Sequence, residues 1–157
     1  MNLFFDIDYT LVSMQGFLRP HVHEVFAQLK KDGHTIYVWS GMGVRWNVVE
    51  AHGLVPYVSG VHSKPIHDYH MAVEMMLRSS ELPVKPDFIV DDYPEIVEVF
   101  SGMAIKPYWF QDLKDQEMDR AYRIIKDVQE TGTSVDLSYM PGRKPQPRPD
   151  KIDPFAR

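Results

Sequence analysis

Apolar residues along this chain fall into short continuous runs that alternate with segments of helical spacing. The runs are β-branched or aromatic and are bounded by polar residues, which is typical of buried strands. The intervening segments repeat apolar residues at helical spacing, and several begin at proline or end at glycine. The expected strands are 2–7, 34–39, 57–61, 86–90 and 102–108, and the expected helices are 21–32, a segment ending near 52, 66–79, 94–100 and 112–130.

This alternation predicts an α/β fold, a three-layer Rossmann-like domain with a central, mainly parallel five-stranded sheet and helices on both faces. The chain has 157 residues, which suits one such domain. Residues 11–18 have no clear helical period, and Gly16 favours a loop or small hairpin there. In sheets of this kind a site forms at the carboxyl ends of the strands, near a topological switch point.

The sequence changes in character after residue 132. Residues 133–157 hold five of the 12 prolines and five of the 17 lysines and arginines. We therefore expect a globular domain at 1–132 and a proline-rich, basic C-terminal tail at 133–157. A tail that is solvated or wrapped over its own domain is favoured over a docking peptide or a polyanion-binding arm.

Composition narrows the classes of function. The formal net charge is −5, which argues against general binding of nucleic acid or of anionic membranes. The chain has no cysteine, so a disulfide framework, a thiolate nucleophile and a cysteine-based zinc site are excluded. The N-terminus does not resemble a signal peptide, and no apolar stretch is long enough for a bilayer span. The expected location is cytoplasmic.

Two pairs of acids follow two of the expected strands. Asp6 and Asp8 end the first strand, and Asp91 and Asp92 end the fourth. Burying unpaired carboxylates is costly, so acids that end buried strands require a compensating charge. A hard divalent cation with oxygen ligands provides that charge, and Mg²⁺ is the usual cation where phosphate is the substrate.

Four segments of the chain, in order, resemble the motifs of the haloacid dehalogenase-like (HAD) hydrolases. FFDIDYTLV resembles the first motif, Asp-x-Asp-x-Thr after an apolar strand, and IYVWSG resembles the second, an apolar strand that ends in serine or threonine. HSKP resembles the third motif, which contains a lysine, and FIVDD resembles the fourth, which ends in a pair of acids. One short motif alone is weak evidence, but four in the family order, covering roughly residues 2–110, are specific. The resemblance implies that 1–132 is a HAD-like catalytic domain.

The resemblance also implies roles for the matching residues. Asp6 would be the nucleophile that forms an aspartyl-phosphate, and Asp8 the general acid that protonates the leaving oxygen and then activates water. Thr10 would brace the turn that carries both acids. The presence of Asp8 points to the phosphotransferase members rather than the dehalogenases.

Further matching residues would bind phosphate and metal. Ser40 and the backbone amide of Gly41 would hold phosphoryl oxygens, and Lys64 would neutralise both Asp6 and the transferring group. Asp92 would bind Mg²⁺ directly, together with the Asp6 carboxylate and the Asp8 backbone carbonyl. Asp91 would support the site from behind or pair with the lysine; which of the two neighbouring acids contacts the metal stays open.

The resulting hypothesis is an Mg²⁺-dependent phosphomonoester phosphatase that acts on a phosphorylated substrate through an aspartyl-phosphate. The intervals Asp8–Ser40 and Ser40–Lys64 are too short for a cap domain, so we expect an open site with Arg45 among the residues able to line its rim. The alternatives are a catalytically silent HAD-like binding or scaffolding domain and, less favoured by the Asp-x-Asp spacing, a receiver-like phosphorylation switch. A homo-oligomer is left open.

Overall fold

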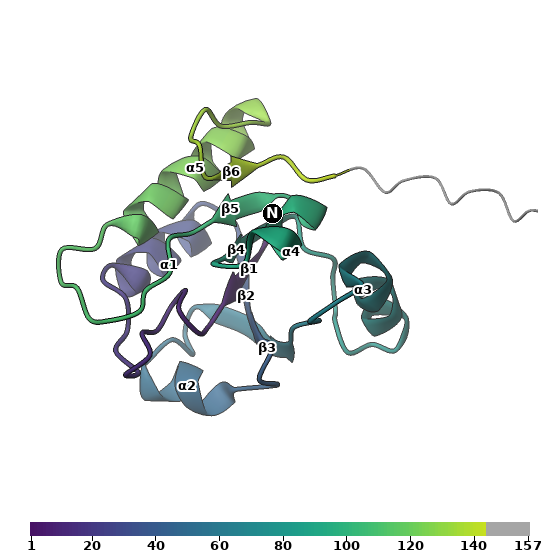
Figure 1. The fold of residues 1–157 in the computed structure, drawn as a ribbon, viewed down its shortest axis with the longest axis horizontal. Helices are drawn as coiled ribbons and strands as arrows, with labels where there is room; N and C mark the ends of the chain where they lie inside the picture. Colours follow the sequence, from purple (N-terminus) through teal and green to yellow (C-terminus); the bar gives the residue numbers. More distant parts are fainter. Residues whose placement is uncertain (144–157) are drawn as a thin grey trace, which may run out of the picture.

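A twisted sheet forms the centre of the molecule (Figure 1). The computed structural model describes residues 1–143. The sheet has six strands in the order β3-β2-β1-β4-β5-β6, and only β6 is antiparallel to its neighbour. The strands are β1 (Asn2–Asp6), β2 (Thr35–Ser40), β3 (Val58–Ser63), β4 (Phe88–Asp91), β5 (Gly102–Ala104) and β6 (Tyr139–Met140). The helices are α1 (Val22–Lys31), α2 (Trp46–Ala51), α3 (Tyr69–Arg78), α4 (Pro94–Phe100) and α5 (Glu117–Thr131).

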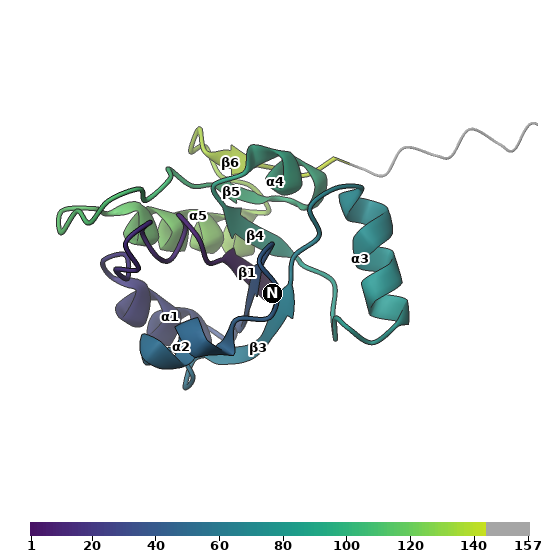
Figure 2. The ribbon, with the colours of Figure 1, turned by 60° about the horizontal axis from the view of Figure 1, so that its bottom comes forward.

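The helices cover both faces of the sheet, because side chains of successive strand residues point to opposite faces. Leu3 and Phe5 of β1 pack with α1, α2 and α5 on one face. Phe4 lies on the other face, in a second apolar cluster with residues of α3 and α4. Figure 2 shows these three layers. The α/β, Rossmann-like fold predicted from the sequence is thus confirmed.

The order of the strands creates a switch point beside β1. The chain runs from β1 outward through β2 to β3, and then crosses through α3 to β4 on the opposite side of β1. Phe5 of β1 consequently has Val38 of β2 on one side and Val90 of β4 on the other. The carboxyl ends of β1 and β4 therefore lie next to each other, where open α/β sheets bind ligands.

The prediction of five strands was one strand short. The sixth, β6, lies within 133–157, the segment assigned to the tail, and it pairs with β5 through Gly102 and Met103. Arg120 of α5 fixes the preceding loop, because its Nε and Nη2 donate to the two carboxylate oxygens of Asp136 at 2.8 and 2.6 Å. The globular part thus continues beyond residue 132, and the tail residues 144–157 lie outside the described part of the chain.

Other differences concern the ends of elements. The fifth strand stops at Ala104 rather than near 108, before Pro107, and the last helix begins at Glu117 rather than 112. Residues 11–18 form the small hairpin that was one of the two expectations, with a bridge between Val12 and Leu18. Within residues 1–143, no helix is both long and apolar enough to cross a membrane.

Close packing of β4 against β5 depends on Gly102. A Cβ at this position would lie 1.9 Å from the carbonyl oxygen of Ile89, and the glycine has a φ of +156°. We predict that Gly102→Ala destabilises the protein by about 3 kcal/mol or more, because β5 has to move away from the strand that carries Asp91. Gly132→Ala is the control: its φ is +80°, but no atom lies within 4 Å of the new Cβ.

Urea denaturation of the wild-type protein and the two variants measures how much free energy of unfolding each variant loses. The control is expected to lose only about 1 kcal/mol, the cost of a strained φ at an open position. Equal losses in the two variants would contradict the role given to close strand packing.

Candidate functional site

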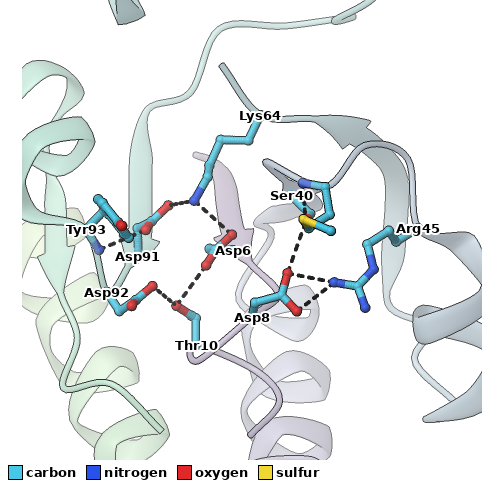
Figure 3. Close-up of polar contacts among 10 residues, drawn as sticks. Asp6, Asp8, Thr10, Ser40, Arg45, Lys64, Asp91, Asp92 and Tyr93 are labelled. Carbon is cyan, nitrogen blue, oxygen red and sulfur yellow. Dashed lines mark hydrogen bonds and ion pairs between the residues drawn. The ribbon is translucent and has the colours of Figure 1, made fainter. Parts of the chain in front are cut away.

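Three carboxylates meet at the carboxyl ends of β1 and β4. Asp6 is the last residue of β1, Asp91 is the last of β4, and Asp92 follows it. One oxygen from each carboxylate lies within 4.8 Å of the others. Figure 3 shows the three side chains gathered around the end of β1. The convergence expected from the two acid pairs is therefore present for these three residues.

Lys64 lies between two of these acids. Its Nζ donates to Asp6 Oδ1 and to Asp91 Oδ2, each at 2.9 Å. The lysine follows β3, and its backbone amide donates to the carbonyl oxygen of Ser40 at 2.9 Å, which ties the loop after β3 to the end of β2. The lysine of the third motif is thus placed against the acids of the first and fourth.

A tight turn after β1 places Thr10 beneath the acids. The carbonyl oxygen of Ile7 accepts from the amides of Thr10, Leu11 and Val12 at 2.9 to 3.3 Å, and Tyr9 adopts a left-handed φ of 61°. The Thr10 hydroxyl is buried and shares its single proton between Asp6 Oδ2 at 3.4 Å and Asp92 Oδ1 at 3.5 Å. It therefore connects the first acid pair to the second.

Asp91 and Asp92 occupy different environments. Asp91 is fully buried, and both of its oxygens have partners, Lys64 on one and the Tyr93 amide on the other at 2.9 Å. Asp92 is partly exposed and lines the pocket, and Thr10 provides its hydrogen bond. Asp92 consequently has more capacity for a further ligand than its neighbour has.

The carboxylates carry more negative charge than their partners balance. Burial raises the pKa of Asp6 well above its ordinary value, the Asp91 charge raises it further, and Lys64 opposes both. Burial likewise raises the pKa of Asp91 to about 6, and raises that of Asp92. Burial alone would lower the pKa of Lys64, but the two carboxylates raise it overall. One ammonium group thus faces three acids.

This donor set fits a hard divalent cation. Such ions bind carboxylate and carbonyl oxygens, and Asp6 and Asp92 both line the same pocket and offer carboxylate oxygens. A cation there would also favour the ionised carboxylates, which burial, and for Asp6 and Asp91 a neighbouring acid, disfavour. Asp91, which is fully buried and does not line the pocket, fits a supporting position behind these two residues.

Asp8 is directed away from the three other acids (Figure 3). Arg45 Nη1 donates to both of its carboxylate oxygens at 2.6 Å, and the Ser40 hydroxyl donates to Oδ2 at 3.2 Å. The side chains of the ion pair are partly exposed, 37% for Asp8 and 27% for Arg45. The sequence placed Arg45 only among rim residues, since nothing in the spacing indicates that it reaches back to the first motif.

Ser40 and Gly41 differ in their access to the pocket. Ser40 is fully buried, and its hydroxyl accepts from the Met42 amide at 3.0 Å while it donates to Asp8. Gly41 is exposed and lines the pocket. In this arrangement Ser40 supports Asp8, so its expected contact with phosphoryl oxygens stays a prediction that requires the hydroxyl to change partner.

An open pocket of about 740 Å³ lies over these groups. The charged residues that line it are Asp6, Asp8, Arg45, Lys64 and Asp92. Aromatic and aliphatic side chains form much of the remaining wall: Tyr9, Met42, Pro65, Ile66, Tyr69, Tyr93 and Ile96. The space exceeds what one phosphoryl group needs and admits an organic molecule.

Comparison with known proteins bears on the fold alone. No family model matches the chain, and no curated protein matches it. Among solved structures, the chain is similar to the crystal structure of an uncharacterized protein from Listeria monocytogenes serotype 4b, with a TM-score of 0.53 and 11% sequence identity. The match covers 83% of this chain and 99% of that one. The shared α/β architecture is what this likeness shows.

The charge imbalance predicts a pH-dependent response to metal. The pKa values of the three acids are higher in the folded protein than in the unfolded chain, so protonation of these acids stabilises the metal-free fold. This stabilisation is complete below the pKa of an aspartate in the unfolded chain, about 4. It is lost as the pH rises through the folded pKa, which for Asp91 is about 6. We expect Mg²⁺ at ~100 times its Kd to stabilise the protein by about 2.7 kcal/mol near pH 7.5, or ~8 °C in Tm, and much less near pH 5.

Differential scanning fluorimetry with and without Mg²⁺ measures this response. Asp92→Asn is expected to reduce the Mg²⁺-induced rise in Tm, whereas Asp112→Asn, an exposed acid before α5, is expected to leave it intact. An Mg²⁺-induced rise in Tm that is equal at both pH values, or equal in the two variants, would contradict a metal site at these acids.

Proposed function

We propose that this chain is an Mg²⁺-dependent phosphomonoester phosphatase that acts through an aspartyl-phosphate on Asp6. The observation that supports it most directly is that Asp6 lines an open pocket, lies 2.9 Å from the Lys64 ammonium group and is grouped with Asp92. A carboxylate nucleophile, a fixed cation and a second carboxylate together suit phosphoryl transfer. The four motifs that resemble HAD hydrolases support the same chemistry.

In the first step an Asp6 carboxylate oxygen attacks phosphorus, and the bond from phosphorus to the leaving oxygen breaks. Lys64 is placed to balance the charge on Asp6 and on the phosphoryl oxygens as that bond changes. Asp6, Asp92 and the backbone carbonyl of Asp8 would hold the Mg²⁺, which supplies further positive charge at the phosphoryl group when bound.

Asp8 handles the proton in both steps. It donates a proton to the leaving oxygen, so that the alcohol departs neutral, and the resulting carboxylate then accepts a proton from the attacking water. The water oxygen bonds to phosphorus as the bond to Asp6 breaks, which releases inorganic phosphate and restores both acids. Both oxygens of Asp8 are hydrogen-bonded to Arg45 in the structure, so Arg45 has to move before Asp8 can reach a leaving group.

That ion pair is the one observation that favours the alternative, a catalytically silent binding or scaffolding domain. An acid permanently held by Arg45 would leave the pocket able to bind a phosphate ester without cleaving it. The two hypotheses differ in whether Asp6 becomes phosphorylated, and variants of Asp6 and Asp8 separate them.

Asp6→Asn is expected to abolish hydrolysis of p-nitrophenyl phosphate, because an amide oxygen is a poor nucleophile toward phosphorus. The loss should reach the detection limit of the release assay, at least ~10⁴-fold. Circular dichroism and Tm establish that the variant is folded, and Asp112→Asn serves as the matched control with wild-type rates. A folded Asp6→Asn protein with near-wild-type activity would contradict the covalent mechanism.

Asp8→Asn is expected to slow the second step more than the first when the leaving group is activated. A p-nitrophenolate needs little protonation, so Asp6 can still be phosphorylated, whereas water attack loses its base and slows by ~10²–10⁴-fold. Rapid-quench mass spectrometry should therefore detect a phosphorylated protein that builds up in this variant. Turnover at wild-type rates on both activated and alkyl esters would show that Asp8 has no such role.

A further inference from the structure

The pocket contains two cations with different surroundings. Lys64 is held between Asp6 and Asp91, two of the clustered acids. Arg45 also lines the pocket, and its one ion pair within residues 1–143 is with Asp8. Its Nη1 makes the bonds to that carboxylate, and its other two guanidinium nitrogens make no hydrogen bond within the described chain.

The pair between Arg45 and Asp8 has to open for catalysis. Three hydrogen bonds, two from Arg45 and one from Ser40, engage the carboxylate that has to approach the leaving oxygen. Separating the guanidinium from its carboxylate without a replacement leaves a partly buried cation unpaired, which is unfavourable. An anionic group on the substrate, the molecule that enters the pocket, would restore a partner to the guanidinium.

The pocket has room for a leaving group that carries such an anion. Its volume of about 740 Å³ exceeds that of a phosphoryl group, and Tyr9, Tyr69 and Tyr93 are among the residues of its wall. A phosphate ester bound over Asp6 would extend its leaving group past Asp8 toward Arg45. Arginine binds carboxylate and phosphate groups in a bidentate manner, so either anion can take the place of Asp8.

We propose that Arg45 determines specificity by selecting phosphomonoesters whose leaving group carries a second anionic group, a carboxylate or a phosphate. The proposal rests on the phosphatase function proposed above. A substrate anion binds Arg45 and at the same time frees Asp8 for the leaving oxygen. A neutral leaving group offers Arg45 no partner, so Asp8 stays engaged.

Two esters of the same shape test this selection. The para-carboxyphenyl and para-carbamoylphenyl phosphates differ by one charge at the position that would face Arg45. We expect the wild-type protein to prefer the carboxylated ester by at least about tenfold in kcat/KM, which corresponds to ~1.4 kcal/mol. Equal values for the two esters would overturn the proposal while leaving the phosphatase function intact.

Variants of Arg45 show whether this residue causes the preference. Arg45→Gln is expected to bring the ratio of the two kcat/KM values close to one, and Arg45→Lys to retain part of the preference, because lysine keeps the charge but not the bidentate geometry. Arg123→Gln, the same change at an exposed position on α5, is the matched control. A merely structural role would lower both rates and leave the ratio unchanged, and that result would overturn the proposal.

Binding to the Asp6→Asn protein separates the two proposals. Calorimetry on this variant measures its affinity for each of the two esters without turnover. The carboxylated ester is expected to bind more tightly than the carbamoyl ester. This difference in affinity is expected to disappear in the double variant Asp6→Asn/Arg45→Gln. An Arg45-dependent difference in affinity, with no hydrolysis by the wild-type protein, would support anion selection and contradict the phosphatase. Hydrolysis that depends on Asp6, with equal affinity for the two esters, would support the phosphatase and overturn the selection.

Discussion

Repulsion among three carboxylates around one lysine is the constraint on which the site depends. Asp6, Asp91 and Asp92 bring oxygens within 4.8 Å of one another, and Lys64 bonds to two of the three. Burial raises the pKa values of all three acids, and repulsion from a neighbouring carboxylate adds to this for Asp6 and Asp91. A site of this kind is stable only if protons or a cation compensate the charge, and a cation leaves the carboxylates able to act as ligands and as a nucleophile.

The fold imposes this arrangement through the topology of the sheet. Because the chain reverses direction across the sheet after β3, β4 returns to the free side of β1, and the acids that end the two strands become neighbours. The loop after β3 is hydrogen-bonded to the end of β2, which brings Lys64 across to the same edge. The acids lie at or directly after the ends of the buried strands β1 and β4, so the packing of the sheet holds these side chains in place.

Much of this could be predicted from the sequence, because the information is local. Short apolar runs ending in Asp6 and Asp91 specify both the strands and the side of the sheet where the acids lie. The strand β6 could not be predicted, since two residues carry no periodicity and their pairing depends on the distant contact between Arg120 and Asp136. Residues 105–116 were predicted partly as strand and partly as helix, although they form neither.

The pairing of Arg45 with Asp8 was also beyond sequence reasoning, because it depends on how the loop before α2 folds back over the end of β1. The residues that line the pocket thus form two groups: Asp6, Asp92 and Lys64 lie together, and Asp8 is paired with Arg45. Under the functions proposed above, the first group would serve the reaction at phosphorus, Asp8 would transfer the proton, and Arg45 would contact the leaving group.

The central claim is that Asp6 itself forms a covalent bond to phosphorus. The most direct measurement is reductive trapping: wild-type protein is acid-quenched during turnover of p-nitrophenyl phosphate, treated with borohydride, and its peptides are analysed by mass spectrometry. An aspartyl-phosphate is reduced to homoserine, so the account predicts homoserine at position 6 and unmodified aspartate at positions 8, 91 and 92. Turnover with no reduced residue at position 6, or with reduction at another aspartate, would contradict it.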